Sequence, residues 1–329
     1  MIIIFYEVTV MLNQRKCAII GCGNVGATTA YTLAQSMLFT ELVLIDIDKK
    51  KAQGEADDIN HALPFISPMD IYAGDYSDLA DAKLIIITAG ASQRKGETRI
   101  DLAKSNVKIF RSIVKNITIY NADAIILVVT NPVDILTQVT LKMSGFPKNR
   151  VFGSGTVLDT SRLKYLVGRH LNVDPRNVHS FIIGEHGDSE LAVWSSANVS
   201  GVDLDKFCES CNRHCSSKSL RSLFDDVRNS AYRIIEAKGA TYYAIAESVK
   251  RIVSAILLDE NAILPLSVYL EGEYDISDIC LGVPCIVGES GIKQVLEIPL
   301  NENEHRLLLN SSDKLKTVMA SLDEIKALL

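Results

Sequence analysis

Four short apolar runs, separated by amphipathic stretches, dominate the first 131 residues of the chain. The runs cover residues 17–20, 42–45, 84–88 and 124–130. Each run is apolar almost throughout, which is typical of parallel strands that are covered on both faces. Helical spacing before the last run predicts one buried helix face, made by Leu102, Ile109, Ile113 and Ile117. This alternation predicts an α/β fold with a doubly wound parallel sheet.

After about residue 150 the pattern changes, so we predict a first domain over residues 16–150 and a second over 151–329. In the second domain we expect a helix at 157–171, an extended run at 178–183, helices through 225–259 and a strand at 281–287. The last segment, from Glu302, carries Leu308, Leu315, Met319 and Leu322 at helical spacing. No Pro/Gly-rich linker separates the two domains, so we expect them to pack tightly together.

Composition limits the class of protein. The chain has 329 residues, of which 47% are hydrophobic, and this is enough to fill the cores of two domains. The net charge of -6 provides no general attraction to nucleic acid or to anionic membranes, so we expect neither as a partner. No apolar run approaches the ~20 residues that a membrane-spanning helix needs.

Residues 1–15 are expected to form an N-terminal extension. Its start, Met1-Ile2-Ile3-Ile4-Phe5-Tyr6, is apolar but lacks both a basic flank and a small-residue cleavage site, so it does not resemble a secretion signal. The seven cysteines are odd in number and scattered, which favours a reducing cytoplasm over a disulfide-stabilised protein.

Three cysteines recur at helical spacing, namely Cys208, Cys211 and Cys215, with His214 beside them. A structural zinc site needs four ligands, usually from two cysteine pairs, and this segment has no second pair. The pattern therefore favours a plain helix, and we expect no metal.

The turn Gly21-Cys22-Gly23-Asn24-Val25-Gly26 follows the first strand and opens a helix. Its glycines would let the backbone approach a pyrophosphate at the helix N-terminus. Asp46 ends the next strand, twenty residues after Gly26. Its carboxylate would accept hydrogen bonds from a ribose diol and repel a 2′-phosphate, which favours NAD over NADP. The alternative is a tight strand–helix turn without a ligand.

The segment Gly184-Glu185-His186-Gly187-Asp188 places one histidine between two glycines, directly after an apolar run. A histidine in a cleft can give or take a proton near neutral pH. Asp159 could hold this imidazole in one tautomer, and Arg162, on the same helix face, could grip a carboxylate with two parallel hydrogen bonds. The alternatives are a structural histidine and a surface ion pair.

Two further polar positions follow strands at the sheet edge where open α/β folds bind ligands. The segment 88–99 is polar and contains glycine, and its Arg99 could polarise a carbonyl once water is expelled. Asn131 could donate a hydrogen bond to a substrate oxygen or to a nicotinamide. The alternative for the segment 88–99 is a basic loop without a role, and the alternative for Asn131 is a turn residue before Pro132.

Taken together, these segments resemble the L-lactate dehydrogenase family, and especially its bacterial type, from about Lys16 to the C-terminus. The motifs that carry the resemblance are residues 21–26, Gly96-Glu97-Thr98-Arg99, Thr130-Asn131-Pro132-Val133-Asp134, Gly153-Ser154-Gly155-Thr156-Val157-Leu158-Asp159-Thr160-Ser161-Arg162, residues 184–188 and Lys238-Gly239-Ala240-Thr241-Tyr242-Tyr243-Ala244-Ile245. The resemblance implies a Rossmann NAD-binding domain, a C-terminal α+β substrate domain and a cytoplasmic homotetramer. It also implies reversible reduction of pyruvate to L-lactate with NADH in fermentative glycolysis.

The resemblance further implies roles for single residues. His186 would be the proton donor and acceptor, oriented by Asp159, while Arg162 would anchor the substrate carboxylate and Arg99 would polarise the ketone. Asn131 and Thr241 would line the substrate and the nicotinamide. The implied cofactor site comprises Gly21, Gly23, Asn24, Val25, Gly26, Asp46, Gly90, Asn131 and Ile245, the last as an apolar wall behind the nicotinamide ring.

Malate dehydrogenases resemble the same pattern but carry arginine six residues before the equivalent of Arg99. Here that position is Gln93, which cannot pair with the second carboxylate of oxaloacetate, so we expect pyruvate as substrate. A loop shift of one residue would instead bring Arg94 into the pocket. Malate or broader L-2-hydroxyacid dehydrogenase activity is one alternative, and a non-catalytic NAD-binding protein is an alternative of a different class.

Many bacterial members of the family are activated by fructose 1,6-bisphosphate at a subunit interface. The resemblance places this site at Lys164 and His179. Two residues along a helix is a rotation of ~200°, so Lys164 points away from Arg162. The family usually has arginine at the first position, and lysine cannot make the same planar contact. Activation and two simply solvated side chains both stay open, and the apolar residues 252–258 fit either a subunit interface or the core.

Overall fold

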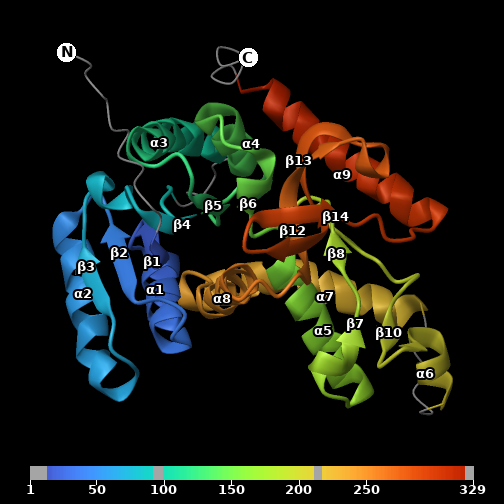
Figure 1. Cartoon of the computed structure of the whole chain (residues 1–329). Coiled ribbons are helices and arrows are strands. Elements are labelled where there is room, and N and C mark those ends of the chain that lie inside the picture. Colours follow the sequence, from blue (N-terminus) through green and yellow to red (C-terminus); the bar gives the residue numbers. More distant parts are fainter. Residues whose placement is uncertain (1–12, 92–98, 211–216, 323–329) are drawn as a thin grey trace, which may run out of the picture.

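A mixed sheet of nine strands runs through the molecule (Figure 1). The computed structural model describes residues 13–91, 99–210 and 217–322. The order across the sheet is β14-β13-β12-β6-β5-β4-β1-β2-β3. The strands are β1 (Asn13–Ile20), β2 (Glu41–Ile45), β3 (Asp70–Ala73), β4 (Ala82–Ile87), β5 (Ile125–Val128), β6 (Val151–Gly153), β12 (Ala262–Glu271), β13 (Ser277–Gly288) and β14 (Gly291–Val295).

The first six strands are all parallel, in the order 3-2-1-4-5-6 that is typical of a Rossmann domain. Helices cover both of their faces, with α3 and α4 on one side and α1 and α8 on the other (Figure 1). The helices of the chain are α1 (Asn24–Ser36), α2 (Lys49–Ala62), α3 (Arg99–Tyr120), α4 (Val133–Ser144), α5 (Val157–Leu171), α6 (Leu204–Ser210), α7 (Ser217–Lys238), α8 (Tyr243–Leu257) and α9 (Glu302–Ala320). The predicted doubly wound α/β fold is confirmed.

The sheet does not stop at the end of the Rossmann part. β12 pairs antiparallel with β6, where Ser267 lies opposite Gly153, and β13 and β14 extend the sheet further. A Cβ on Gly153 would lie 2.4 Å from the Thr137 hydroxyl and 3.1 Å from the Ser267 Cβ, so this junction has no room for a side chain. The tight packing expected between the two parts therefore includes a shared sheet.

A second, smaller core lies between α5, α6 and α7. It includes Leu163, Val167, Val178, Ile182 and Leu204, all nearly or fully buried. Short strands complete this part: β7 (Val178–His179), β8 (Ile182–Ile183), β9 (Leu191–Ala192), β10 (Asn198–Val199) and β11 (Val202–Asp203). The run expected to be extended at 178–183 contains two separate strands, since β7 pairs with β10 whereas β8 pairs with β9.

One other expectation needs correction, and two regions are now defined more closely. The helices expected through 225–259 are α7 and α8, which are separated at Gly239, where φ is +86°. Ile109 was placed on the buried face of α3, but it is 36% exposed, and Phe110 and Val114 are buried instead. The apolar residues at 252–258 mainly pack inside the chain, since Ile252, Val253, Ala255 and Ile256 are fully buried.

The cysteines divide into two groups. Cys17, Cys22, Cys280 and Cys285 are free and buried, as expected for a reduced protein. Cys208, on α6, is disulfide-bonded, so the expectation of reduced cysteines fails at this residue. Cys211, His214 and Cys215 lie outside the described residues.

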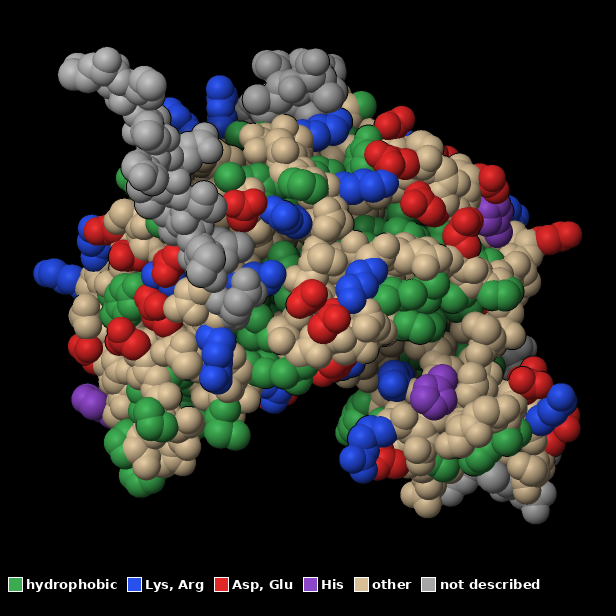
Figure 2. Space-filling model, in the orientation of Figure 1, with side chains coloured by type: hydrophobic (Ala, Val, Ile, Leu, Met, Phe, Trp, Pro, Cys, Tyr) green, Lys and Arg blue, Asp and Glu red, His purple; other side chains and the backbone are tan. Residues whose placement is uncertain are grey.

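Charged side chains of both signs are intermingled on the face shown in Figure 2. An anionic ligand approaching this face would therefore have to be held by individual cations. None of the helices in the described ranges is long and apolar enough to span a membrane.

Lys16, within β1, connects the start of β2 to the residue that precedes β4. It is 6% exposed and forms ion pairs with Glu41 at 2.8 Å and Asp81 at 2.7 Å. Glu41 also accepts a hydrogen bond from the Tyr72 hydroxyl at 2.7 Å. The carboxylates are thus compensated by one buried ammonium group, and each loses a partner if it is removed.

We expect Lys16→Ala to lower the free energy of unfolding by about 2 kcal/mol, because it leaves two partly buried carboxylates without their cation. The matched control is Lys49→Ala, which breaks an exposed ion pair with Asp75 and should cost less than about 1 kcal/mol. Urea denaturation followed by circular dichroism measures both values. Equal losses in the two variants would contradict the stabilising role of Lys16.

Candidate active site

A cavity of about 180 Å³ lies where the Rossmann part meets the second part of the chain. Its wall combines the segment after β8, the first turn of α5, the residues after β5 and one face of α7. Four residues selected from the sequence line it together: Asn131, Asp159, Arg162 and His186. These side chains come from three separate segments of the chain, and the fold brings them to one place.

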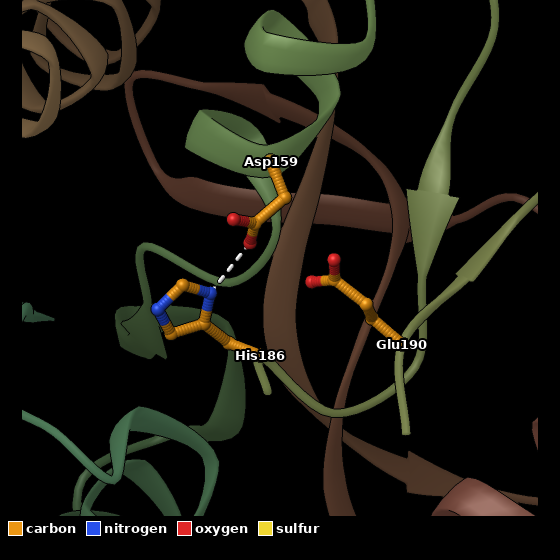
Figure 3. A group of neighbouring side chains, drawn as sticks. All are labelled: Asp159, His186 and Glu190. Carbon is orange, nitrogen blue, oxygen red and sulfur yellow. Dashed lines mark hydrogen bonds and ion pairs between the residues drawn. The ribbon is translucent and has the colours of Figure 1, made fainter. Parts of the chain in front are cut away.

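His186 and Asp159 form a close polar contact in this cavity. The Nδ1 atom of His186 lies 2.5 Å from Oδ2 of Asp159 (Figure 3). Burial alone would lower the pKa of the imidazole, but the negative charge and hydrogen bond of Asp159 outweigh it and raise the pKa of His186 to about 9. Since Nδ1 is bound to Asp159, the other ring nitrogen is the one available to a ligand.

Arg162 binds the second oxygen of the same carboxylate. Its Nη1 donates to Oδ1 of Asp159 at 2.8 Å, three residues away on α5. Burial would raise the pKa of Asp159, but the charges and hydrogen bonds of His186 and Arg162 hold it below its usual value. Asp159 therefore stays ionised although it is only 2% exposed. This bond uses one of five guanidinium N–H donors, which leaves others for a carboxylate.

Asp134 fixes the backbone at His186. Its Oδ2 accepts a hydrogen bond from the His186 amide at 2.9 Å, and its Oδ1 accepts one from the Ser267 hydroxyl at 2.5 Å. Asp134 is 2% exposed, and burial raises its pKa to about 6. The sequence analysis gave this residue no role, since a carboxylate inside a helix pattern does not show which amide it will meet.

α7 forms one side of the cavity and is tied to the histidine segment. Arg228 donates to the backbone carbonyl of Asp188 at 2.6 Å, and the Tyr232 hydroxyl donates to the Asp188 carboxylate at 3.1 Å. Val227, Ala231 and Ile235 add apolar surface to the same wall. The cavity thus combines a cationic end with an apolar side, which suits a small organic acid.

Asn106 joins the segment after β4 to Asn131. It is fully buried, accepts a hydrogen bond from the Ala91 amide at 2.7 Å and donates one to the Asn131 carbonyl at 2.7 Å. Gly90 is required beside it, because a Cβ there would lie 2.4 Å from Thr130. Sequence reasoning missed Asn106, although a polar residue on the apolar face of a predicted helix was a usable signal.

The glycine turn has the shape that a dinucleotide needs. A Cβ on Gly26 would lie 1.8 Å from the Gly21 carbonyl oxygen, whereas a Cβ on Gly23 would meet nothing within 4 Å. Gly23 precedes α1, and no side chain caps the first turn of that helix. Its free amides therefore face open space, which fits an anionic pyrophosphate. Asp46 accepts the Cys22 amide at 2.6 Å, which brings its carboxylate to the same turn.

Several of the residues selected from the sequence do not meet at the cavity. Thr241 and Ile245 lie at the α7–α8 junction and do not line it. Arg99 starts α3, but its side chain, Gln93 and Arg94 lie outside the described residues. Lys164 and His179 lie on α5 and β7, apart from the cavity, and burial lowers the pKa of Lys164.

Comparison with known proteins shows the family to which this chain belongs. Residues 15–153 match the lactate/malate dehydrogenase NAD-binding domain, and residues 156–326 match the alpha/beta C-terminal domain of the same family. The chain belongs to the lactate/malate dehydrogenase family. The resemblance inferred from the motifs is confirmed, as is the NAD-binding character of the Rossmann part.

The similar proteins span nearly the whole chain. The L-lactate dehydrogenase of Acetivibrio thermocellus is 54% identical over 309 residues, which cover 94% of this chain and 98% of that protein. L-lactate dehydrogenase 1 of Clostridium acetobutylicum is 50% identical over 315 residues, covering 96% of this chain and 100% of that protein. Among solved structures, the minor L-lactate dehydrogenase of Enterococcus mundtii in its ligands-bound form has a TM-score of 0.91 at 43% identity, covering 94% and 98% of the two chains.

The two glycines of the turn provide a matched test of the cofactor site. Gly23 has an extended backbone that alanine can adopt, so we expect Gly23→Ala to fold normally but to bind NADH about tenfold or more weakly. Gly26→Ala should instead destabilise the protein, because its Cβ meets the Gly21 backbone. NADH fluorescence titration and thermal unfolding separate the two effects. Unchanged NADH affinity in Gly23→Ala would place the pyrophosphate elsewhere.

Proposed function

We propose that this chain is an NAD-dependent L-lactate dehydrogenase that reversibly reduces pyruvate to L-lactate in fermentative glycolysis. The observation that carries the proposal is the meeting of His186, Asp159 and Arg162 in one cavity of a chain about half identical to bacterial L-lactate dehydrogenases. The pairing of a proton carrier with a carboxylate anchor is the chemistry that a 2-keto acid requires.

The catalytic roles follow from the contacts. Arg162 holds the substrate carboxylate through N–H groups that Asp159 does not use. Protonated His186 donates its proton to the substrate oxygen from the nitrogen opposite Asp159, while the ionised Asp159 stabilises the imidazolium. Bound NADH supplies the hydride for the ketone carbon. In the reverse direction neutral His186 removes the hydroxyl proton of lactate.

Other residues support this chemistry in the proposal. Asn131 lines the cavity and is aligned by Asn106. Arg99 polarises the ketone, and Thr241 and Ile245 approach the substrate and the nicotinamide. The turn residues Gly21, Gly23, Asn24, Val25 and Gly26, together with Asp46 and Gly90, hold the dinucleotide.

The pH dependence follows from the raised pKa of His186. Pyruvate reduction needs the protonated imidazole, so its kcat/KM should fall as pH rises through about 9, while lactate oxidation should rise over the same range. Asp159→Asn removes the charge that raises this pKa, so the alkaline limb should move to lower pH. At neutral pH its kcat/KM should fall about 10²-fold or more. Steady-state rates at 340 nm across pH measure both effects.

A surface carboxylate is the control for that experiment. Asp174 is paired with Arg176 away from the cavity, so Asp174→Asn should leave the pH profile unchanged. An alkaline limb that stays in place in Asp159→Asn would show that Asp159 does not set the proton affinity of His186.

Substrate choice rests on Gln93. Wild type should prefer pyruvate over oxaloacetate, and Gln93→Arg should shift kcat/KM toward oxaloacetate, because an added cation pairs with the second carboxylate. These kcat/KM values are measured for a panel of substrates that also includes bulkier 2-keto acids, with and without fructose 1,6-bisphosphate. Equal wild-type rates with the two keto acids would remove the preference, and no NADH oxidation with any acid would leave the non-catalytic alternative.

The same panel tests regulation. Lys164 and His179 lie on neighbouring elements away from the cavity, which is compatible with a separate anion site in a homotetramer. Activation predicts a lower pyruvate KM with the sugar bisphosphate, and a hyperbolic curve unchanged by it would exclude that mechanism. A cytoplasmic location stays part of the proposal.

A further inference from the structure

Glu190 is a buried carboxyl group beside the His186–Asp159 pair. It follows the histidine segment directly before β9, it is 7% exposed, and it lines the same cavity. Ligand atoms of Asp159, His186 and Glu190 all lie within 4.8 Å of one another. Figure 3 shows the Glu190 carboxyl group pointing toward the pair, without a bond to either.

Within the described ranges, no group donates a hydrogen bond to the Glu190 side chain. Asp159, by contrast, receives hydrogen bonds from both His186 and Arg162. A buried carboxylate without donors is costly, and a second carboxylate nearby makes ionisation costlier still. Burial and the charge of Asp159 accordingly raise the pKa of Glu190 to about 9, against the opposing charges of His186, Arg162 and Arg228.

The other carboxylates around the cavity have partners of their own. Asp134 accepts from the His186 amide and Ser267, Glu185 accepts from Ser189, and Asp188 accepts from Tyr232. Glu190 therefore differs from these three, because no donor offsets its burial and the nearby charge of Asp159 adds to the effect.

The protonation state of Glu190 decides the charge offered to the substrate. With Glu190 ionised, its charge and that of Asp159 cancel those of protonated His186 and Arg162. With Glu190 neutral, the four groups carry one net positive charge. In a cavity of low dielectric, that difference acts directly on the binding of a monocarboxylate.

We propose that Glu190 is a positioning residue that keeps its proton while Asp159 stays ionised, so that it adds no second negative charge beside His186 and Arg162, the cations that bind the substrate. The inference rests on the proposed function and deepens it. Binding of the keto acid then depends on two protons, one on His186 and one on Glu190.

The experiment measures the dissociation constant of oxamate, the amide analogue of pyruvate, for the enzyme–NADH complex from about pH 7 to about pH 10.5. Wild-type affinity should fall toward about a hundredfold per pH unit at the alkaline end, because two groups lose protons there. Glu190→Gln mimics the protonated acid, so its affinity should fall only about tenfold per unit. At pH 7 the two proteins should agree within about threefold.

Glu185→Gln is the matched control, because it removes a carboxylate from the same segment and should keep the steep wild-type slope. Glu190→Leu, also uncharged, repeats the test if the glutamine variant does not fold. Oxamate binding that tightens about tenfold or more at pH 7 in Glu190→Gln would mean that wild-type Glu190 is ionised and would overturn the proposal. Equal slopes in wild type and Glu190→Gln would overturn it as well.

Infrared spectroscopy provides a readout that does not need turnover. Wild type at pH 7 should show the carbonyl band of a protonated carboxyl group, sensitive to deuterium exchange and lost in Glu190→Gln. Absence of that band would refute the inference and leave the proposed lactate dehydrogenase activity untouched. An enzyme that shows the band but never oxidises NADH with pyruvate would count against the proposed function instead.

Discussion

One buried carboxylate, Asp159, organises the catalytic end of this protein. Its two oxygens bind two different cations, His186 through the imidazole and Arg162 through the guanidinium. The same charge therefore orients the proton carrier, raises its pKa and places the carboxylate anchor beside it. Because Asp159 lies in the first turn of α5, the position of that helix sets the geometry of both partners.

α5 is held in place by the continuous sheet. Its N-terminus follows β6, the last parallel strand, at the point where β12 joins the sheet. The Thr156 hydroxyl donates to the Ile182 carbonyl at 2.6 Å, which connects the start of α5 to β8 and hence to the histidine segment. Asp134 completes the frame from α4 by holding the His186 amide. The site therefore depends on pairing between strands far apart in sequence.

The sequence could predict much of this fold because local patterns carry it. Continuous apolar runs identified β1, β2, β4 and β5, and helical spacing identified α5 and α9 with its buried Leu308 and Leu315. β3 and β6 were missed because neither is a continuous apolar run: β3 begins with Asp70, and β6 has only three residues and ends at Gly153. The break between β7 and β8 also escaped, since only their pairing partners distinguish them from one strand.

Some residues of the candidate site could likewise be selected from the sequence, and others could not. His186, Asp159 and Arg162 stood out because their residue types suit proton transfer and carboxylate binding, and the resemblance to the family assigned them these roles. Asp134, Asn106 and Glu190 did not, because their roles depend on partners that tertiary folding brings near. Thr241 and Ile245 were selected by resemblance and do not line the cavity, so sequence similarity alone did not establish their contacts.

The three buried acids around His186 show how hydrogen-bond partners modify the effect of burial on charge. All three are less than about a tenth exposed. Asp159 meets two cationic donors and stays ionised, with its pKa below the usual value. Asp134 meets one amide and one hydroxyl, and its pKa rises to about 6. Glu190 meets no donor in the described part of the chain, and its pKa rises to about 9. Burial raises the pKa of all three, and the order follows from the donors of each acid together with the charge of Asp159 beside Glu190. The fold thus places one permanent anion and one neutral acid within 4.8 Å of the same imidazole, with the permanent anion bound to the proton carrier.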